Sequence, residues 1–252
     1  MANSAIISDK QRLGLLLDLA LEGVEYEDYY FGYIFQATAG AVGFEDLCSF
    51  GGGLTVPAAA FGLAVSSTAG GDTMDVLVTG LDADGNLQTA TKTLTGQTKA
   101  VIATLTWTWV YRVEVVGTTD AAGTIWVFED DDTVTAGVPD TQAKKKISAF
   151  VTLNLGSTCC FKVPTGKKAI ILKAKTGGPT FNVKPSGGLK IKRPGEVFKF
   201  CMLGQEGNVN SPSTSPEGIY GNYEAGTEIR LVCSATATEA YTGELHLLLK
   251  DA

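Results

Sequence analysis

The feature that most constrains the fold of this chain is an alternation of apolar and polar residues with a period of two. It begins near Leu54 and is clearest from Thr106 to Val116, where the odd positions are apolar and the even positions are mixed. Successive side chains of a β-strand point to opposite faces of a sheet, so this segment is predicted to form one sandwich strand with a buried face. That face would carry Trp107, Trp109, Tyr111, Val113 and Val115.

The same alternation recurs at turn-punctuated intervals along the chain. It is seen in Ile147 to Leu155, in Leu189 with Ile191, in Ile229 to Cys233 and in Leu245 to Leu249. Between Ile125 and Phe128 both faces are apolar, which predicts a strand that is central or lies at an interface. Thirty glycines and many threonines and valines favour strands joined by tight turns over helices. The sequence therefore predicts an all-β chain of jelly-roll-like β-sandwich domains.

The charges divide the chain into two halves. Up to Asp140 there are 19 acidic and 5 basic residues, and from Thr141 onward there are 8 acidic and 15 basic residues. We therefore expect an N-terminal arm over residues 1–50, an acidic β-sandwich domain over 51–140 and a basic one over 141–252. Opposed charges favour head-to-tail docking of copies, or docking of the basic half on an acidic partner. The alternative is two domains that simply differ in composition.

The first fifty residues depart from the period of two. Ser8 with Gln11 has the form of a helix-capping box, and leucines at helical spacing up to Gly23 permit one short amphipathic helix. An aromatic run follows, and about forty residues cannot bury a core of their own. We predict that this arm packs on a neighbouring subunit through an interface rich in aromatic rings; the alternative is that it covers its own domain. The candidate interface residues are Tyr26, Tyr29, Tyr30, Phe31 and Tyr33.

Residues that carry chemistry are scarce. His246 is the single histidine, it alternates with Glu244 and Lys250 on a polar strand face, and no serine or cysteine motif accompanies it. We interpret it as a surface histidine, and we predict no catalytic residue, no cofactor and no metal site. The five cysteines show no CxxC spacing, which favours reduced thiols and assembly inside a cell. No segment is long and apolar enough for a membrane helix, so no membrane partner is expected.

Two motifs leave an alternative open. The segment from Asp82 to Asn86 offers oxygens at alternate positions, as a calcium loop does, but its Asp-Gly pair between apolar runs favours a hairpin turn. Trp107, Trp109 and Trp126 could stack on sugar rings, as in a carbohydrate-binding module. Because Trp107 and Trp109 share their face with other apolar residues, a place in the core is favoured.

The basic half contains the second set of candidate interface residues. Lys190 and Lys192 alternate with apolar residues and point outward in the predicted strand. We predict that they dock, with nearby basic residues, on an acidic partner surface. Nucleic acid is not the expected partner, because the basic half lacks an arginine-rich stripe and interleaved aromatic residues. The residues of this set are Lys190, Lys192, Arg193 and Lys199.

A series of short motifs between residues 45 and 175 follows a characteristic order. They are Glu45-Asp46-Leu47, Gly51-Gly52-Gly53, Val56-Pro57, Val65-Ser66-Ser67 with Asp72, Val78 to Gly85, Thr93 to Gly96, Tyr111 to Val115, Ala122 to Ile125 and Val163 to Lys167. In this order they resemble a broad group of tailed-bacteriophage virion structural proteins.

This resemblance implies a non-enzymatic protein that is built into the virion in many copies. The role it implies best is that of a head decoration or cement protein that forms a trimer. Such a protein binds the major capsid protein and copies of itself, and it is assembled in the cytoplasm of the host bacterium. The same resemblance allows a tail, collar or head-fibre component. A carbohydrate-binding module is the expectation from a different class of protein.

Overall fold

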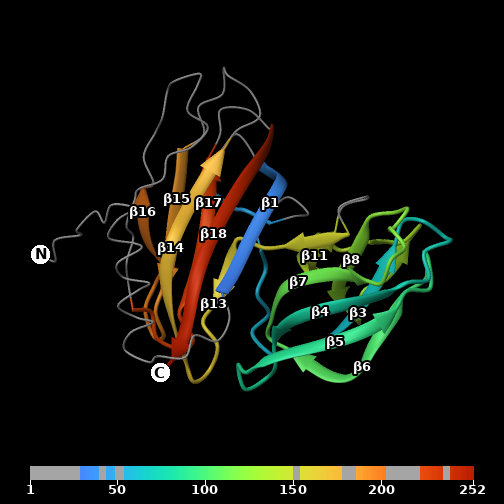
Figure 1. The fold of residues 1–252 in the computed structure, drawn as a ribbon, viewed down its shortest axis with the longest axis horizontal. Helices are drawn as coiled ribbons and strands as arrows, with labels where there is room; N and C mark the ends of the chain where they lie inside the picture. Colours follow the sequence, from blue (N-terminus) through green and yellow to red (C-terminus); the bar gives the residue numbers. More distant parts are fainter. Residues whose placement is uncertain are drawn as a thin grey trace, which may run out of the picture. The chain divides into compact units, whose positions relative to one another are not determined.

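The computed structural model describes residues 29–39, 44–48, 54–149, 154–177, 186–202, 222–234 and 239–252. Almost every element in these ranges is a β-strand, and the helical element they contain is a short 3-10 helix, Gln142–Lys144. The prediction of an all-β chain is therefore confirmed (Figure 1). The chain divides into two compact units: Leu47–Thr158, called here the central unit, and Met1–Asp46 together with Cys159–Ala252, called the terminal unit.

The central unit consists of two four-stranded antiparallel sheets that enclose a common apolar core. The first sheet has the order β11 (Lys145–Ala149), β8 (Ile125–Glu129), β3 (Phe61–Ser67) and β6 (Ala100–Trp107). The second has the order β12 (Leu155–Ser157), β7 (Trp109–Val116), β4 (Asp75–Leu81) and β5 (Leu87–Thr93). A small ribbon of β9 (Val134–Thr135) and β10 (Val138–Pro139) follows β8.

The predicted strand from Thr106 to Val116 is in fact two strands. The chain leaves the first sheet after Trp107 and enters the second sheet at Trp109. Thr108 makes this corner, where its amide donates to the Leu81 carbonyl and its hydroxyl donates to the Asp82 carbonyl. The register of β7 shifts between Arg112 and Val110, so Val110, and not Trp109 or Tyr111, joins Trp107 in the core that the two sheets share. Trp107 and Trp109 are nevertheless both buried, as predicted, with 0% and 2% of their surface exposed.

Strand β8 is central in its sheet, between β11 and β3, as its two apolar faces predicted. At the edge of the same sheet, β6 is irregular. Phe61 pairs with Trp107, whereas Leu63 pairs with Ile102, so residues 103–106 form a bulge. Within this bulge Thr104 has a positive φ of 71°, a conformation that a β-branched residue rarely adopts.

The segment from Asp82 to Asn86 forms the turn of the β4–β5 hairpin, which agrees with the favoured interpretation. Leu81 pairs with Leu87, and Gly85 adopts a positive φ of 81°. One oxygen of the Asp82 carboxylate accepts the amide N–H groups of Asp84 and Asn86, at 2.9 and 2.8 Å. Asp82 therefore serves the turn itself.

The boundary between the two units differs from the expected one after Asp140. β11 pairs with β8, and β12 pairs with β7, so both strands belong to sheets of the central unit. The central unit consequently extends to Thr158. The change in charge at Asp140 misplaces the boundary because Lys144 to Lys146, which open the basic half, form the edge of an otherwise acidic unit.

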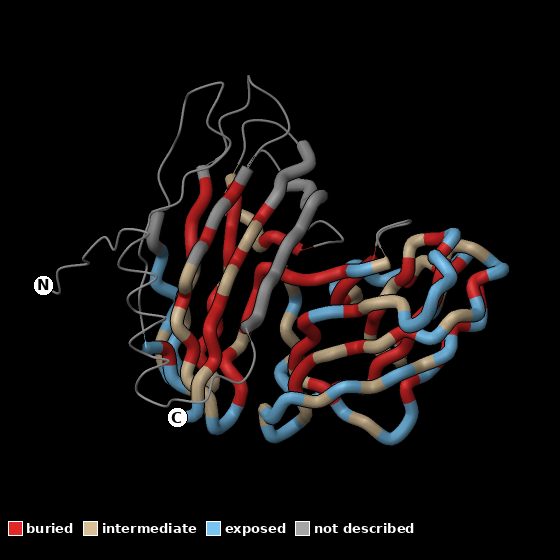
Figure 2. Tube along the Cα trace, viewed as in Figure 1, coloured by how far each residue is buried: buried red, intermediate tan, exposed pale blue. Residues whose placement is uncertain are grey.

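The terminal unit contains two antiparallel sheets that contact each other. One has the order β1 (Tyr29–Ala39), β18 (Glu239–Asp251) and β14 (Lys167–Gly177). The other has the order β13 (Cys160–Lys162), β17 (Glu228–Ser234), β15 (Ser186–Lys192) and β16 (Lys199–Met202), and β2 (Glu45–Asp46) also pairs with β17. Buried residues predominate along the described parts of β17 and β18 (Figure 2), and they include Ile229, Leu231, Leu245 and Leu247.

The aromatic run of the N-terminal segment includes strand β1. The backbone of β1 pairs with β18 of its own chain, for example Tyr30 with Leu247 and Phe31 with His246. The structure thus places this part of the segment on its own unit, which is the alternative to packing on a neighbour. Tyr26 and the proposed short helix lie outside the described residues, and of Tyr29, Tyr30, Phe31 and Tyr33 only the backbone is described.

Candidate interaction surface

One face of the sheet around β15 gathers basic and aromatic side chains. Leu189 is fully buried on the core side of β15, and the alternation places Lys190 and Lys192 on the opposite side. Lys190 pairs in register with Arg230 of β17 and with Phe200 of β16, so these residues share that side. We call the following set the basic–aromatic face: Phe44, Lys190, Lys192, Phe198, Phe200 and Arg230, flanked by Arg193.

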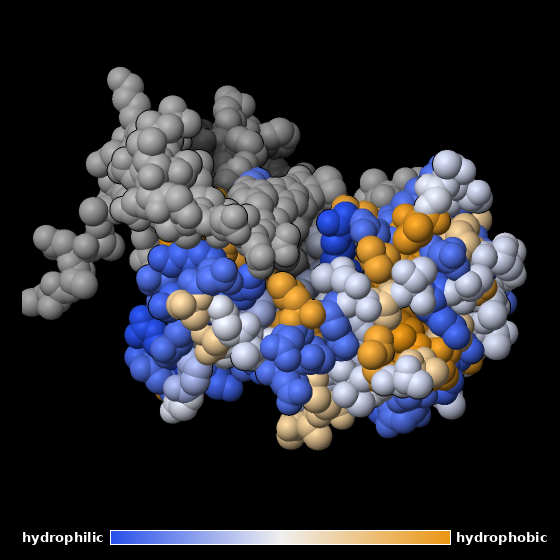
Figure 3. Space-filling view, turned by 60° about the horizontal axis from the view of Figure 1, so that its bottom comes forward, coloured by the Kyte–Doolittle hydropathy of each residue, from blue (hydrophilic) through white to orange (hydrophobic). Residues whose placement is uncertain are grey.

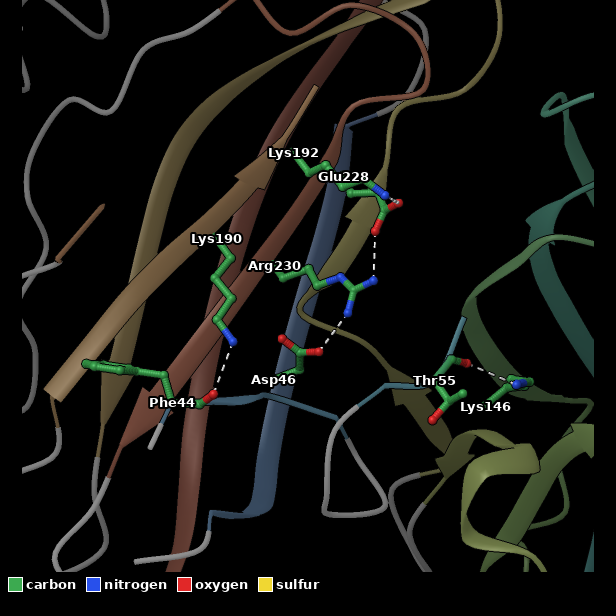
Figure 4. A network of polar contacts seen from close by, with 8 residues as sticks. All are labelled: Phe44, Asp46, Thr55, Lys146, Lys190, Lys192, Glu228 and Arg230. Carbon is green, nitrogen blue, oxygen red and sulfur yellow. Dashed lines mark hydrogen bonds and ion pairs between the residues drawn. The ribbon is translucent and has the colours of Figure 1, made fainter. Parts of the chain in front are cut away.

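Arg230 holds the centre of this face. Its guanidinium forms ion pairs with Asp46 at 2.8 Å and Glu228 at 2.7 Å, and its side chain is 11% exposed (Figure 4). Burial acts to lower the pKa of Arg230, but the charge of Asp46 and the hydrogen bonds to Glu228 and Asp46 raise it overall, so Arg230 remains charged. Arg230 thereby fixes β2 against β17, although Asp46 and Arg230 are 184 residues apart.

The phenylalanines lie among these cations. The ring of Phe198 lies 4.8 Å from the guanidinium carbon of Arg230 and 5.6 Å from Nζ of Lys192, both within cation–π range. Phe200 packs against Phe44 with ring centroids 4.5 Å apart. Phe198 and Phe200 are nevertheless 38% and 44% exposed. These two rings are ordered by their neighbours and remain open to a partner.

Of the four basic candidates predicted from the sequence, Lys190 and Lys192 lie on this face and Arg193 lies beside it, whereas Lys199 pairs with Ile191 and therefore points to the opposite side of the sheet. The Nζ of Lys190 donates to the Phe44 carbonyl at 3.1 Å, and Lys192 forms an ion pair with Glu228 at 3.3 Å. Arg193 is exposed in the turn after β15, and Lys199 pairs with Glu196 at 2.8 Å. Phe198 and Phe200 were not predicted as part of the site, although they interleave with the basic residues. They alternate with Lys199 in the sequence, and this alternation was the available signal that the two rings share one side of a strand.

A second face, on the central unit, combines exposed apolar side chains with acidic residues in place of basic ones. On the outer side of the second sheet, Leu155 pairs with Glu114, Glu114 with Leu77, and Val116 with Asp75. Val116 and Leu155 are 45% and 41% exposed. Asp120 accepts a hydrogen bond from Asn154, the residue before Leu155, at 2.6 Å. We call this set the acidic–apolar face: Asp75, Leu77, Glu114, Val116, Asp120 and Leu155.

The surface of the central unit, green in Figure 1, carries hydrophobic patches between hydrophilic residues in Figure 3. On the acidic–apolar face the nearby cation is Arg112, which pairs with Glu114. The face therefore keeps an excess of carboxylates around its exposed apolar residues.

Other chemically interesting side chains have local partners. His246 is not the exposed histidine that was expected: its side chain is 16% exposed and its Nε2 lies 2.7 Å from Glu244. Cys48, Cys159, Cys160 and Cys233 are buried free thiols. Burial, with a smaller contribution from Glu45, raises the pKa of Cys233 to about 12.

Within the described ranges, no group of three or more histidine, cysteine, aspartate or glutamate side chains could hold a metal ion. The same part of the chain has no helix with the length and apolar character that crossing a membrane requires.

Lys146 is a buried cation in the central unit. Its side chain is 3% exposed, and its Nζ pairs with Glu129 at 2.6 Å and donates to the carbonyls of Thr55 and Ala143 at 3.1 and 3.3 Å (Figure 4). Burial lowers the pKa of Lys146, while the hydrogen bond to Glu129 acts to raise it. These contacts hold the segment before β3 in place, which is a structural role.

The comparisons with known proteins give little guidance. No protein-family model and no curated protein matches the chain. Among solved structures, the chain is similar to that of the infectious bursal disease virus Gt strain, at 10% identity and a TM-score of 0.23, covering 90% of this chain and 68% of the other. It is also similar to the infectious bursal disease virus VP2 subviral particle, at 8% identity and a TM-score of 0.25, covering 90% and 72%. TM-scores this low do not establish a shared fold.

Proposed function

We propose that this chain is a non-enzymatic structural protein of a tailed-bacteriophage virion and that it acts by binding other proteins. The basic–aromatic face carries the proposal. Phe198 and Phe200 are exposed aromatic residues held in place by neighbouring side chains, and Lys190, Lys192 and Arg230 lie beside them. Aromatic anchors inside a polar rim are typical of protein interfaces.

Within the virion, the proposed role is that of a head decoration protein which stabilises the capsid. Its partners would be the major capsid protein and other copies of itself, as a trimer. The order of motifs shared with phage virion proteins supports this role, and most of these motifs lie in the central unit. Buried free thiols are consistent with assembly in the host cytoplasm.

The burial of Trp107 and Trp109 speaks against the carbohydrate-binding alternative. Trp107 lies in the core of the central unit and Trp109 is buried, so neither ring is open to a sugar. Trp126 is half-buried, and Lys145 lies 4.9 Å from its ring centroid. A flat platform of three exposed tryptophans is therefore not formed.

The location of the chain in an averaged image of the intact particle tests the proposal. Density at icosahedral positions on the head, identified by an antibody fragment against this chain, is the expected result. Density confined to the tail, collar or head fibres would favour the alternative virion role. If purified particles lack the chain, the virion role is wrong.

Attachment to capsids tests the part played by the face. Reversing two exposed charges, Lys192→Glu with Arg193→Glu, should weaken attachment more at low salt than at high salt, because exposed charges are screened beyond about 8 Å at physiological ionic strength. Attachment that is independent of salt and unchanged by the reversal would show that these residues are only a solvated surface.

A further inference from the structure

We infer, on the basis of the function proposed above, that the protein bound by the basic–aromatic face is a second copy of this chain, which presents its acidic–apolar face. Copies would then join head to tail, the terminal unit of one against the central unit of the next. Two kinds of complementarity between the faces support this pairing.

The first is complementarity of charge. On the basic–aromatic face and beside it, Lys190, Lys192, Arg193 and Arg230 outnumber the carboxylates that accompany them, Asp46 and Glu228. On the acidic–apolar face, Asp75, Glu114 and Asp120 outnumber Arg112. Opposite net charges steer two surfaces together and fix their register.

The second is complementarity of apolar surface. The exposed aromatic rings of Phe198 and Phe200 lie beside the cations of the basic–aromatic face. The exposed side chains of Val116 and Leu155 lie among the carboxylates of the acidic–apolar face. A contact that pairs the charges would also bury these apolar groups against each other. Each such burial adds affinity, because apolar area is removed from water.

Other partners fit the basic–aromatic face less well. The same face of another copy would bring cations against cations, which repel. A nucleic acid strand would meet carboxylates as well as cations, and the ring of Phe198 already has Lys192 and Arg230 near it, whereas stacking on a base needs an open ring. An acidic protein surface with small apolar side chains matches both features of the face.

A head-to-tail contact is heterologous, since it joins two different surfaces. Such contacts close into a ring when the rotation between copies allows it and otherwise continue as a fibre. A ring that closes after three copies would produce the trimer of the proposed function.

The experiment measures self-association of the purified full chain by sedimentation velocity, over a range of protein concentrations at low and high salt. One variant reverses the basic side, Lys192→Glu with Arg193→Glu. The other reverses the acidic side, Asp75→Lys with Asp120→Lys. We expect the wild type to associate, more strongly at low salt, and each variant alone to associate about tenfold more weakly. Mixing the two variants should restore association, because each reversed face then meets an unlike face.

A matched control carries Lys168→Glu with Lys250→Glu, which changes the net charge by as much but lies on the other sheet of the terminal unit. It should associate like the wild type. Far-UV circular dichroism and tryptophan emission check that each variant is folded.

A wild type that stays monomeric, an association unaffected by either reversal, or a mixture that fails to associate would overturn the pairing. So would tight binding of a single-stranded oligonucleotide that the basic reversal abolishes. If the pairing fails while the chain is found on the head of intact particles, the proposed function stands and only the identity of the partner is wrong.

Discussion

The central and terminal units are both built from antiparallel sheets, but they draw on the sequence differently. The central unit is one continuous stretch, Leu47–Thr158, whose strands pair with neighbours from the same stretch. The terminal unit takes β1 and β2 from before the central unit and all its other strands from after it. The terminal unit therefore depends on contacts between residues far apart in the sequence, and forming such contacts costs more chain entropy than forming the more local contacts of the central unit.

Both units use a buried cation to hold an early segment of the chain. In the terminal unit Arg230 binds Asp46, and in the central unit Lys146 binds the carbonyl of Thr55, 91 residues away. All three tryptophans of the chain, Trp107, Trp109 and Trp126, lie in the central unit. Tryptophan emission therefore reports on the central unit, while far-UV circular dichroism reports on both units, so the two can be followed separately.

The largest expected effect comes from deleting residues 1–39. This removes β1 and leaves the edge of β18 unpaired, so the terminal unit should lose a large share of its stability. In urea, circular dichroism should show an early transition that tryptophan emission does not follow. If both signals instead keep the wild-type midpoint, β1 contributes nothing to its own unit, and the segment is free to act as an arm on a neighbour.

Arg230→Met is expected to have the next largest effect. It leaves the largely buried carboxylate of Asp46 without this cation and that of Glu228 with the more distant Lys192, and removing one partner of a buried ion pair typically costs about 3–5 kcal/mol. The loss should appear in circular dichroism and not in tryptophan emission. As a control, Lys199→Met removes an exposed cation and should cost less than about 1 kcal/mol. If the two substitutions lower the free energy of unfolding equally, burial does not determine how much Arg230 contributes to stability.

Lys146→Met makes the corresponding change in the central unit. It removes the cation that faces Glu129 and two backbone carbonyls, and we expect a cost of about 3 kcal/mol, seen this time in tryptophan emission. Lys145→Met is the matched control, because Lys145 is the neighbouring, less buried lysine. Adding Glu129→Gln to Lys146→Met should recover part of the loss, since no uncompensated charge remains.

The smallest expected effect concerns the pH dependence of the central unit. The hydrogen bond from Lys144 holds the pKa of Asp131 below its ordinary value. A carboxyl with a lowered pKa in the folded state stabilises the fold above its unfolded pKa, and this contribution is lost as the pH falls through the folded pKa. Asp131→Asn should therefore flatten the decline of stability below about pH 4, measured by urea unfolding. If stability below about pH 4 declines in the variant as it does in the wild type, the contact between Lys144 and Asp131 has no net effect on stability.

The sequence predicts the local parts of this fold well. The all-β class, the hairpin at Asp82 to Asn86, the central position of β8 and the burial of Trp107 and Trp109 all follow from short patterns of apolar, glycine and aspartate residues. The corner at Thr108 could not be predicted, because buried residues stand on both sides of it, so the apolar run continues although the chain passes from one sheet to the facing one. The register shift that follows in β7 leaves Trp109 and Tyr111 outside the shared core, although both keep the predicted burial.

The candidate site was predicted in part for a related reason. The alternation of their own strand predicts that Lys190 and Lys192 lie on one face. Phe44 and Asp46 lie on the same face, but they precede the central unit in the sequence, whereas the lysines follow it. No local pattern connects residues that are 146 or 184 positions apart. The units differ here as well, since the acidic–apolar face is formed by neighbouring strands of one continuous stretch.

The irregular edge strand β6 has a consequence for the proposed function, which would place many copies of the chain on one surface. A straight edge strand offers a row of free N–H and C=O groups to which any other strand can add, and crowding favours such addition. The bulge at residues 103–106, with Thr104 in a left-handed conformation, interrupts that row. Packed densely on a shared surface, copies are thereby discouraged from stacking their sheets edge to edge into amyloid-like aggregates.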